Sequence, residues 1–141
     1  MGYGTVGGQP VTLNEYVKFV DEIVIAIMIE TKSLVDDIEE ALSTPGIDMI
    51  QFGPSDYSIA IGHPGEGYKN AEITEAMERS YKVARRKGIR IRAECTVEEM
   101  QKWIDLGCRD FCIGSETATI SAWAQKTGKA IRETLTRSNI L

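Results

Sequence analysis

The sequence has few of the residues on which many kinds of site depend. It contains one histidine, His63, and three cysteines, Cys95, Cys108 and Cys112, in 141 residues. Cys108 and Cys112 lie four positions apart without a histidine partner at zinc-site spacing, and three cysteines do not suggest a disulfide framework. We therefore expect buried, reduced thiols rather than a zinc centre or a disulfide network.

Long apolar runs and strong charge are also missing. No apolar stretch reaches about 18 residues, the length of a membrane-spanning helix, and the N-terminus lacks a signal-peptide pattern. The net charge of −5 gives no reason to expect binding to nucleic acid or to a membrane. With 43% hydrophobic residues, the chain can bury one core. We therefore expect a cytoplasmic protein that forms one domain over residues 1–141.

The most informative stretch predicts a strand, a helix and a second strand. Ile23–Ile29 is a continuous apolar run, as is typical of a strand buried on both faces, and Glu30 follows it. A second run at 47–52 is followed by Gly53–Asp56. Because side chains at the carboxyl ends of parallel strands line the ligand crevice, Glu30 and Asp56 are predicted to face one pocket. Two carboxylates with room for water suit a hard divalent cation such as Mg²⁺.

The rest of the chain alternates between helices and strands. Third and fourth strands are predicted at 89–93 and 110–114. Helix starts are predicted at Thr12 with Glu15, Ser33 with Asp36 and Thr96 with Glu99, and further helices at about 71–87 and about 115–136.

Two segments are predicted without regular structure. Met1–Pro10 is rich in glycine, and since no GK[ST] motif follows, it is interpreted as a flexible lead-in rather than a phosphate-binding loop. Residues 57–70 predict a long loop, and loops of this length are often functional. His63 lies in this segment and is interpreted as a loop histidine rather than a catalytic one.

Paired motifs resemble a known family. Met28-Ile29-Glu30-Thr31, followed about one βα unit later by the FGPSDYS segment Phe52–Ser58, resembles the HpcH/HpaI aldolases, which are class II, metal-dependent pyruvate aldolases on a TIM barrel. Leu106-Gly107 before Phe111–Gly114 is similar to the approach to the family's eighth strand. The resemblance covers about residues 12–130. It implies that the four strands are strands five to eight, the C-terminal half of a (β/α)₈ barrel.

The resemblance also implies a site. Glu30 and Asp56 correspond to the two metal carboxylates, which would bind Mg²⁺ or Mn²⁺, with Co²⁺ as a further candidate. Gly53, Ser55 and Asp56 would bind a pyruvate-type 2-oxo acid, with the backbone N–H groups of Ser55 and Asp56 directed at its carboxylate. The implied reaction is retro-aldol cleavage of a 4-hydroxy-2-oxo acid to pyruvate and an aldehyde.

The sequence departs from the family pattern in several places. No arginine or histidine matches the two that the family uses for substrate polarisation and proton transfer, so no catalytic residue is assigned in this chain. Met28 stands where the family often has a glutamine, and Glu116 stands near a frequent aspartate. Glu94 either enters the pocket or pairs with Arg92 or another neighbour. The turn at 114–116 is either an anion site or a plain strand-to-helix turn.

Three hypotheses about function follow. The first is a truncated or partial aldolase. The second is an acyl-CoA lyase of the citrate-lyase β-subunit type, which has a related Glu/Asp pair but acts on thioesters; the GPSDYS segment favours the aldolase. The third is a non-catalytic half-barrel that acts as an assembly module. Four parallel strands leave two free edges, which predicts a homo-oligomer or association with the missing N-terminal half-barrel.

Overall fold

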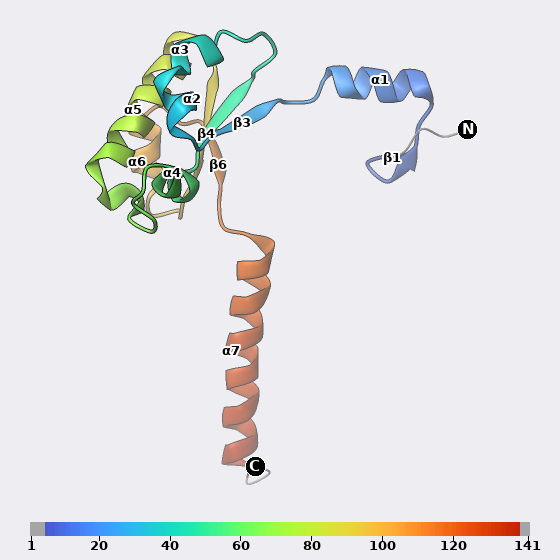
Figure 1. Cartoon of the computed structure of the whole chain (residues 1–141). Coiled ribbons are helices and arrows are strands. Elements are labelled where there is room, and N and C mark those ends of the chain that lie inside the picture. The colour runs from blue at the N-terminus through green and yellow to red at the C-terminus, as the bar shows by residue number, and fades with distance from the viewer. Residues whose placement is uncertain (1–4, 139–141) are drawn as a thin grey trace. The chain divides into compact units, whose positions relative to one another are not determined.

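The computed structural model, which describes residues 5–138, contains a four-stranded parallel sheet with flanking helices (Figure 1). The strands follow the order β3 (Ala26–Ile29), β4 (Met49–Phe52), β5 (Arg90–Glu94) and β6 (Asp110–Cys112). All four predicted strands are therefore present, and the fold is that of half a (β/α)₈ barrel. The first strand begins three residues later than predicted, at Ala26 rather than Ile23. The chain divides into two compact units, one ending at Ile91 and the other beginning at Arg92.

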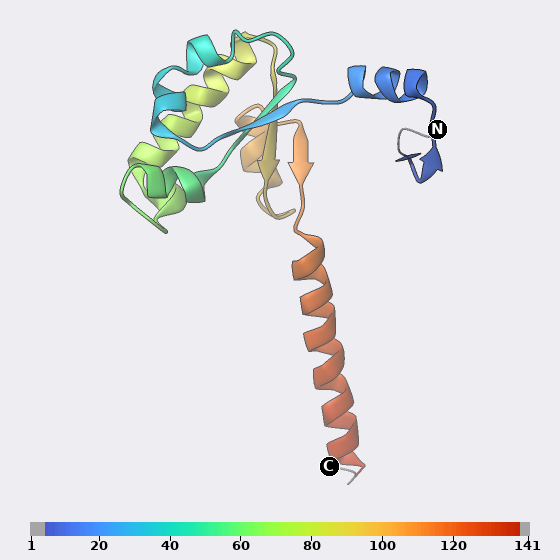
Figure 2. The same cartoon turned by 45° about the vertical axis from the view of Figure 1, so that its right-hand side comes forward.

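In the first unit, strands β3 and β4 form one side of the core, and three helices form the other. These helices are α2 (Lys32–Asp36), α3 (Ile38–Ala41) and α5 (Ala71–Arg86), and Figures 1 and 2 both show them on the same side of the two strands. The side chains that fill this core are fully or almost fully buried: Ile29, Val35, Ile38, Ile50, Phe52, Ile73, Met77, Tyr81 and Ala84. The buried face of α5 thus carries Ile73, Met77, Tyr81 and Ala84, whereas Leu34 of α2 is only half-buried.

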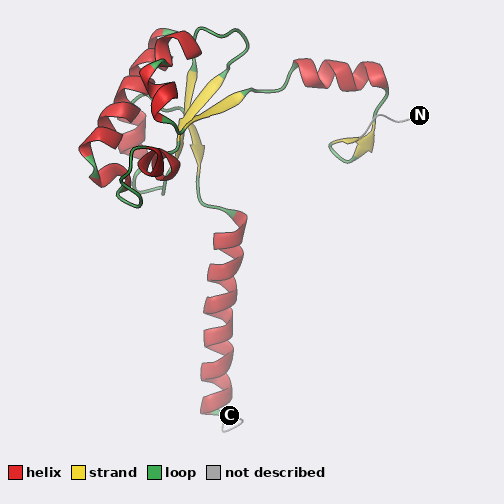
Figure 3. Cartoon of the chain, viewed as in Figure 1, coloured by secondary structure: helices red, strands yellow, loops and turns green. Residues whose placement is uncertain are grey.

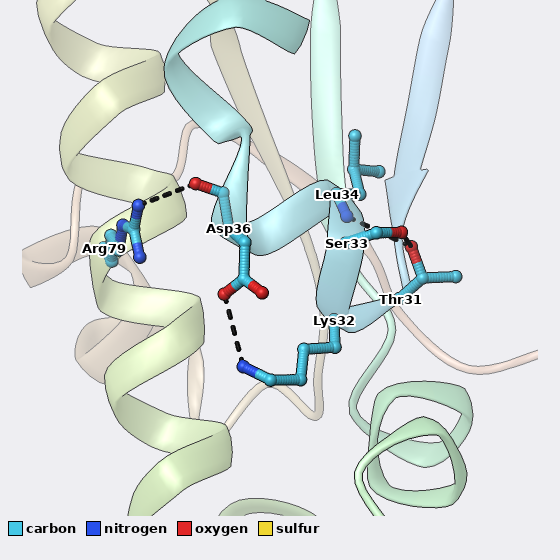
Figure 4. Close-up of polar contacts among 6 residues, drawn as sticks. All are labelled: Thr31, Lys32, Ser33, Leu34, Asp36 and Arg79. Atoms are coloured by element: carbon cyan, nitrogen blue, oxygen red, sulfur yellow. Dashed lines mark hydrogen bonds and ion pairs between the residues drawn. The ribbon is translucent and has the colours of Figure 1, made fainter.

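Helix α2 begins earlier than the sequence predicted. Its N-cap is Thr31, whose hydroxyl oxygen accepts a hydrogen bond from the Leu34 N–H at 3.3 Å, so the predicted start at Ser33 is wrong (Figure 4). Asp36, the expected capping partner, instead forms an ion pair with Lys32 at 3.2 Å. Its carbonyl oxygen accepts a hydrogen bond from Arg79 of α5 at 2.9 Å, which ties α2 to α5.

Residues 5–10 form a small antiparallel hairpin of β1 (Thr5–Val6) and β2 (Gln9–Pro10). The prediction of a flexible lead-in is therefore wrong for these residues, while Met1–Gly4 lie outside the described residues. Gly7 and Gly8 have φ values of 57° and 80°, and two consecutive residues with positive φ are what a two-residue hairpin turn requires. Gly7 and Gly8, two of the glycines that suggested flexibility, thus form this turn.

Helix α1 (Leu13–Asp21) begins at Thr12 and has the predicted capping box with Glu15, but buries none of its residues. Together with the segment that follows, it forms what we call the N-terminal apolar surface, a set of large apolar side chains that are each 40–55% exposed: Leu13, Tyr16, Val17, Phe19, Val20, Ile23, Val24, Ile25 and Met28. Monomeric proteins rarely expose apolar patches larger than a few hundred Å². These nine side chains lie outside the buried core.

The second unit contains the end of β5, β6 and two helices, α6 (Met100–Asp105) and α7 (Glu116–Arg137) (Figure 3). Helix α6 begins four residues after the predicted start at Thr96, because residues 97–99 form a turn in which Glu99 accepts a hydrogen bond from the Thr96 N–H at 3.0 Å. Helix α7 begins after Ser115, as predicted. Among the helices in residues 5–138, none combines the length and the apolar character needed to cross a bilayer.

Candidate metal and substrate site

Glu30 and Gly53 leave their strands side by side. The parallel register pairs Ile29 with Phe52, and the Gly53 N–H donates a hydrogen bond to the Ile29 carbonyl at 3.0 Å. Because side chains alternate along a strand, Glu30 lies on the face opposite to buried Ile29. The register therefore fixes the position of one predicted metal carboxylate.

Gly53 makes room for the Glu30 side chain. A Cβ at this position would lie 2.7 Å from both the Cγ and the Oε1 of Glu30, so the carboxylate arm rests on the Gly53 backbone. The φ of Gly53 is −101°, which any residue can adopt, so space rather than backbone freedom requires glycine here. The absence of a side chain at Gly53 thus leaves space for the Glu30 side chain beside the start of α4.

Asp56 lies in the first turn of helix α4 (Pro54–Ala60), which begins directly after β4. The segment Gly53–Asp56 is therefore a helix start, with Pro54 in the first turn, where a missing N–H costs nothing. The predicted loop at 57–70 is correspondingly wrong at its beginning and end, because α4 continues to Ala60 and a 3₁₀ turn occupies Gly67–Lys69. Asp56 is exposed, and Glu30 is half-buried.

An aromatic contact packs helix α4 against the end of β4. Tyr57 is buried, and its ring lies 5.2 Å from that of Phe52, measured between centroids. Burial raises the pKa of the Tyr57 hydroxyl, so it stays protonated at neutral pH. The helix that carries Asp56 is therefore packed against Phe52 at the end of β4, the strand that Gly53 directly follows.

His63 lies in the loop that remains, residues 61–66, as predicted. Its Nδ1 is 3.0 Å from Glu66 Oε1, and the other Glu66 oxygen accepts a hydrogen bond from Asn70 at 2.7 Å. The hydrogen bond from Asn70, followed by that of His63, lowers the pKa of Glu66. Asn70 in turn caps α5 by accepting from the Glu72 N–H at 2.8 Å. His63 thus belongs to a series of hydrogen bonds that links this loop to the start of α5.

One polar residue near the site was missed from the sequence. Gln51 is buried in the middle of β4 and is paired in register with Met28, two residues before Glu30. The Gln51 side chain therefore places an amide, which can donate hydrogen bonds, next to Met28, whose thioether cannot. The signal was present, since Gln51 is the one polar residue in the stretch Met49–Phe52.

Several residues of the second unit that the sequence singled out line one groove of that unit. Arg92, Glu94 and Cys112 face it from the strands, and Ser115 and Glu116 from the start of α7. The Ser115 hydroxyl caps this helix by accepting from the Ala118 N–H at 3.2 Å, as in an ordinary strand-to-helix turn. All three cysteines are free thiols; Cys95 and Cys108 are buried as expected, and Cys112 is half-buried.

The part of the chain that the structure describes gathers no cluster of three or more His, Cys, Asp or Glu side chains suited to a metal ion. Glu30 and Asp56 are two carboxylates at the carboxyl ends of β3 and β4. Mg²⁺ keeps several waters and is commonly bound by only one or two carboxylates. Two protein ligands with open positions therefore suit an ion that also binds a small oxygen-rich molecule.

A parallel half-barrel with acidic residues at the carboxyl ends of adjacent strands places them at the face where TIM-barrel enzymes have their active sites. The chain is a member of the HpcH/HpaI aldolase/citrate lyase family, whose sequence profile matches residues 6–108. The family expected from the two motifs is therefore confirmed.

Named relatives share part of their length with this chain. It is 27% identical over 112 residues to a 5-keto-4-deoxy-D-glucarate aldolase of Klebsiella pneumoniae, covering 79% of this chain and 43% of that protein. It is 25% identical over 111 residues to a hydroxypyruvate/pyruvate aldolase of Roseovarius nubinhibens, covering 76% and 42%. The crystal structure of an HpcH/HpaI aldolase from Desulfitobacterium hafniense matches with a TM-score of 0.70 and 28% identity, covering 92% and 53%. The chain thus spans about half the length of these relatives.

Proposed function

We propose that this chain carries the metal-binding and pyruvate-binding half of an aldolase site. Glu30 and Asp56 would be the protein ligands of Mg²⁺ or Mn²⁺, and Co²⁺ is a further candidate. The observation that carries the proposal is the close contact between Glu30 and Gly53. It explains why a glycine stands between a strand and the helix that presents Asp56. The test is whether a divalent cation stabilises the folded chain through these two carboxylates.

The proposed reaction class is retro-aldol cleavage of a 4-hydroxy-2-oxo acid to pyruvate and an aldehyde. When bound, a divalent cation supplies Lewis-acid stabilisation of the negative charge that develops on the 2-oxo oxygen. Ser55 and Asp56 lie in the first turn of α4, whose N–H groups lack intrahelical acceptors and would bind the substrate carboxylate. Pro54 has no N–H and fixes only the start of the helix.

The chain on its own is expected to show little or no turnover. It carries no residue that matches the family's arginine or histidine, so it would bind the 2-oxo acid without polarising it fully or moving its proton. A coupled assay for pyruvate release from a 4-hydroxy-2-oxo acid measures this. Rapid, metal-dependent pyruvate release by the 141-residue chain alone would contradict the assignment of a half-site.

The acyl-CoA lyase hypothesis has one supporting observation, since the family that matches also includes citrate lyases. This activity would act on a thioester rather than on a free 2-oxo acid. Saturable binding of a CoA thioester, in the absence of any binding of pyruvate, would favour it over the aldolase.

We further propose that the N-terminal apolar surface is covered by another barrel segment, either from a second copy of this chain or from an N-terminal half-barrel. Strand β3 is at one edge of the sheet and β6 at the other, so each leaves a free edge for pairing. Sedimentation should therefore show association at micromolar concentration. Replacing exposed Val17 and Val24 with glutamate should weaken association without unfolding the chain, because both side chains lie outside the core.

A folded monomer at micromolar concentration would contradict self-association of the chain. Association without metal binding or turnover would instead favour the third hypothesis, a non-catalytic assembly module.

A further inference from the structure

Ser58 is a fully buried polar residue two positions after Asp56, and its hydroxyl makes two hydrogen bonds. It donates to the Ser55 carbonyl at 2.6 Å and accepts from the Gly65 N–H at 3.3 Å. The Ser58 carbonyl also accepts from the His63 N–H, at 2.8 Å. Three hydrogen bonds therefore connect this residue to the first turn of α4 and to the loop at 61–66.

The bond to Ser55 acts on the peptide unit that leads into Asp56. The Ser55 carbonyl and the Asp56 N–H belong to one planar peptide, so fixing the oxygen on Ser58 also fixes the direction of the N–H. That N–H is one of the two proposed to bind the substrate carboxylate, and the Cα of Asp56 is attached to the same plane.

The bond to Gly65 extends this order to the loop. Gly65 has a φ of 82°, a backbone conformation that residues with a side chain rarely adopt. The loop therefore reaches Ser58 in a conformation that favours glycine at position 65. The same loop is held by the contacts among His63, Glu66 and Asn70. Ser58 is thus the point where the turn that bears Asp56 and the loop that bears His63 join.

We infer that Ser58 is a positioning residue for the site at Asp56. It orients the peptide before Asp56 and couples ligand binding there to the order of the loop at 61–66. The inference rests on the proposed metal and 2-oxo acid site. Alanine at position 58 would keep the helix but remove both a donor and an acceptor, leaving the Ser55 carbonyl and the Gly65 N–H without their buried partner.

Ser80 of α5 offers a matched control. It is equally buried, and its hydroxyl donates to the Ala76 carbonyl of its own helix at 2.8 Å. Ser58→Ala and Ser80→Ala therefore remove the same hydroxyl from two buried helix positions. Only the first breaks the bond to the loop.

The test measures Mn²⁺ affinity by calorimetry and hydrogen exchange at the Gly65 amide in the 141-residue chain. Ser58→Ala is expected to weaken Mn²⁺ binding roughly 10- to 100-fold, as is usual when a group that supports a metal ligand is removed. It should also speed exchange at Gly65, while Ser80→Ala leaves both quantities at the wild-type level. Wild-type Mn²⁺ affinity in Ser58→Ala would overturn the inference.

The Mn²⁺ affinities of the wild-type chain and of Ser58→Ala together separate failure of the inference from failure of the proposed function. If the wild-type chain binds Mn²⁺ and Ser58→Ala binds it equally well, Ser58 has no positioning role although the metal site stands. If the wild-type chain does not bind Mn²⁺, the proposed function fails and the role of Ser58 at that site fails with it, whatever the exchange at Gly65.

Discussion

Mn²⁺ is expected to raise the free energy of unfolding of the chain by about 2.7 kcal/mol when free metal is a hundred times its Kd. The reason is linkage: a cation that binds the folded chain through Glu30 and Asp56, at the carboxyl ends of β3 and β4, and does not bind the unfolded chain shifts the equilibrium toward the folded state. Asp56→Asn keeps the shape of the side chain but removes its charge, and should abolish most of this gain. Urea unfolding with and without Mn²⁺ measures the difference.

Two controls separate the metal effect from general effects of charge and stability. Glu40→Gln removes one negative charge from an exposed position on α3, and should leave the increment from Mn²⁺ unchanged. Ile38→Ala should lower stability by about 2–5 kcal/mol, because Ile38 is completely buried, yet it should retain the same increment. An unchanged stability of the wild-type chain on adding Mn²⁺, or an equal gain in Asp56→Asn, would refute the proposed pair.

Gly53→Ala is expected to remove the stabilisation by Mn²⁺ and to lower the stability of the metal-free chain by about 1–3 kcal/mol, the usual cost of overpacking. The added methyl group would lie 2.7 Å from the Glu30 side chain, so Glu30 must rotate away from the position in which it lies beside the start of α4. Urea unfolding with and without Mn²⁺, together with a calorimetric titration, tests both effects.

Gly128→Ala is the matched control for this substitution. Gly128 lies within α7, and a Cβ at this position would meet no atom within 4 Å. Alanine there should therefore stabilise the helix by about 0.5–1 kcal/mol and leave Mn²⁺ binding unchanged. If Gly53→Ala binds Mn²⁺ as tightly as the wild-type chain, the contact between Gly53 and Glu30 does not position a metal ligand.

The order of strands and helices and the inward face of α5 could be predicted from the sequence because they depend on local periodicity. Ile73, Met77, Tyr81 and Ala84 recur at helical spacing, and all four are buried. The places of Glu30 and Asp56 near the carboxyl ends of β3 and β4 could be predicted in the same way, because Glu30 directly follows one apolar run and Asp56 comes four positions after the end of the next, at Phe52.

What the sequence did not reveal depends on competition between neighbours or on contacts across the fold. Thr31 and Ser33 can both cap a helix, and only the backbone conformation selects Thr31, which is extended at φ −123° and ψ 150°. The contact between Gly53 and Glu30 depends on the register of two strands separated by a helical connection. The bond from Gly65 to Ser58 likewise depends on how α4 and the next loop pack.

The pairing of Ile29 with Phe52 also determines where this sequence can change length during evolution. The turn between Ser43 and Gly46 joins α3 to β4, so residues gained or lost there would leave the direction of Glu30 and Gly53 unchanged. A single residue inserted within β3 would instead turn every later side chain of the strand to the opposite face, which would place Glu30 on the buried face that Ile29 now occupies. Insertions and deletions that preserve the carboxylate pair should therefore accumulate in the turn and be absent from the strand.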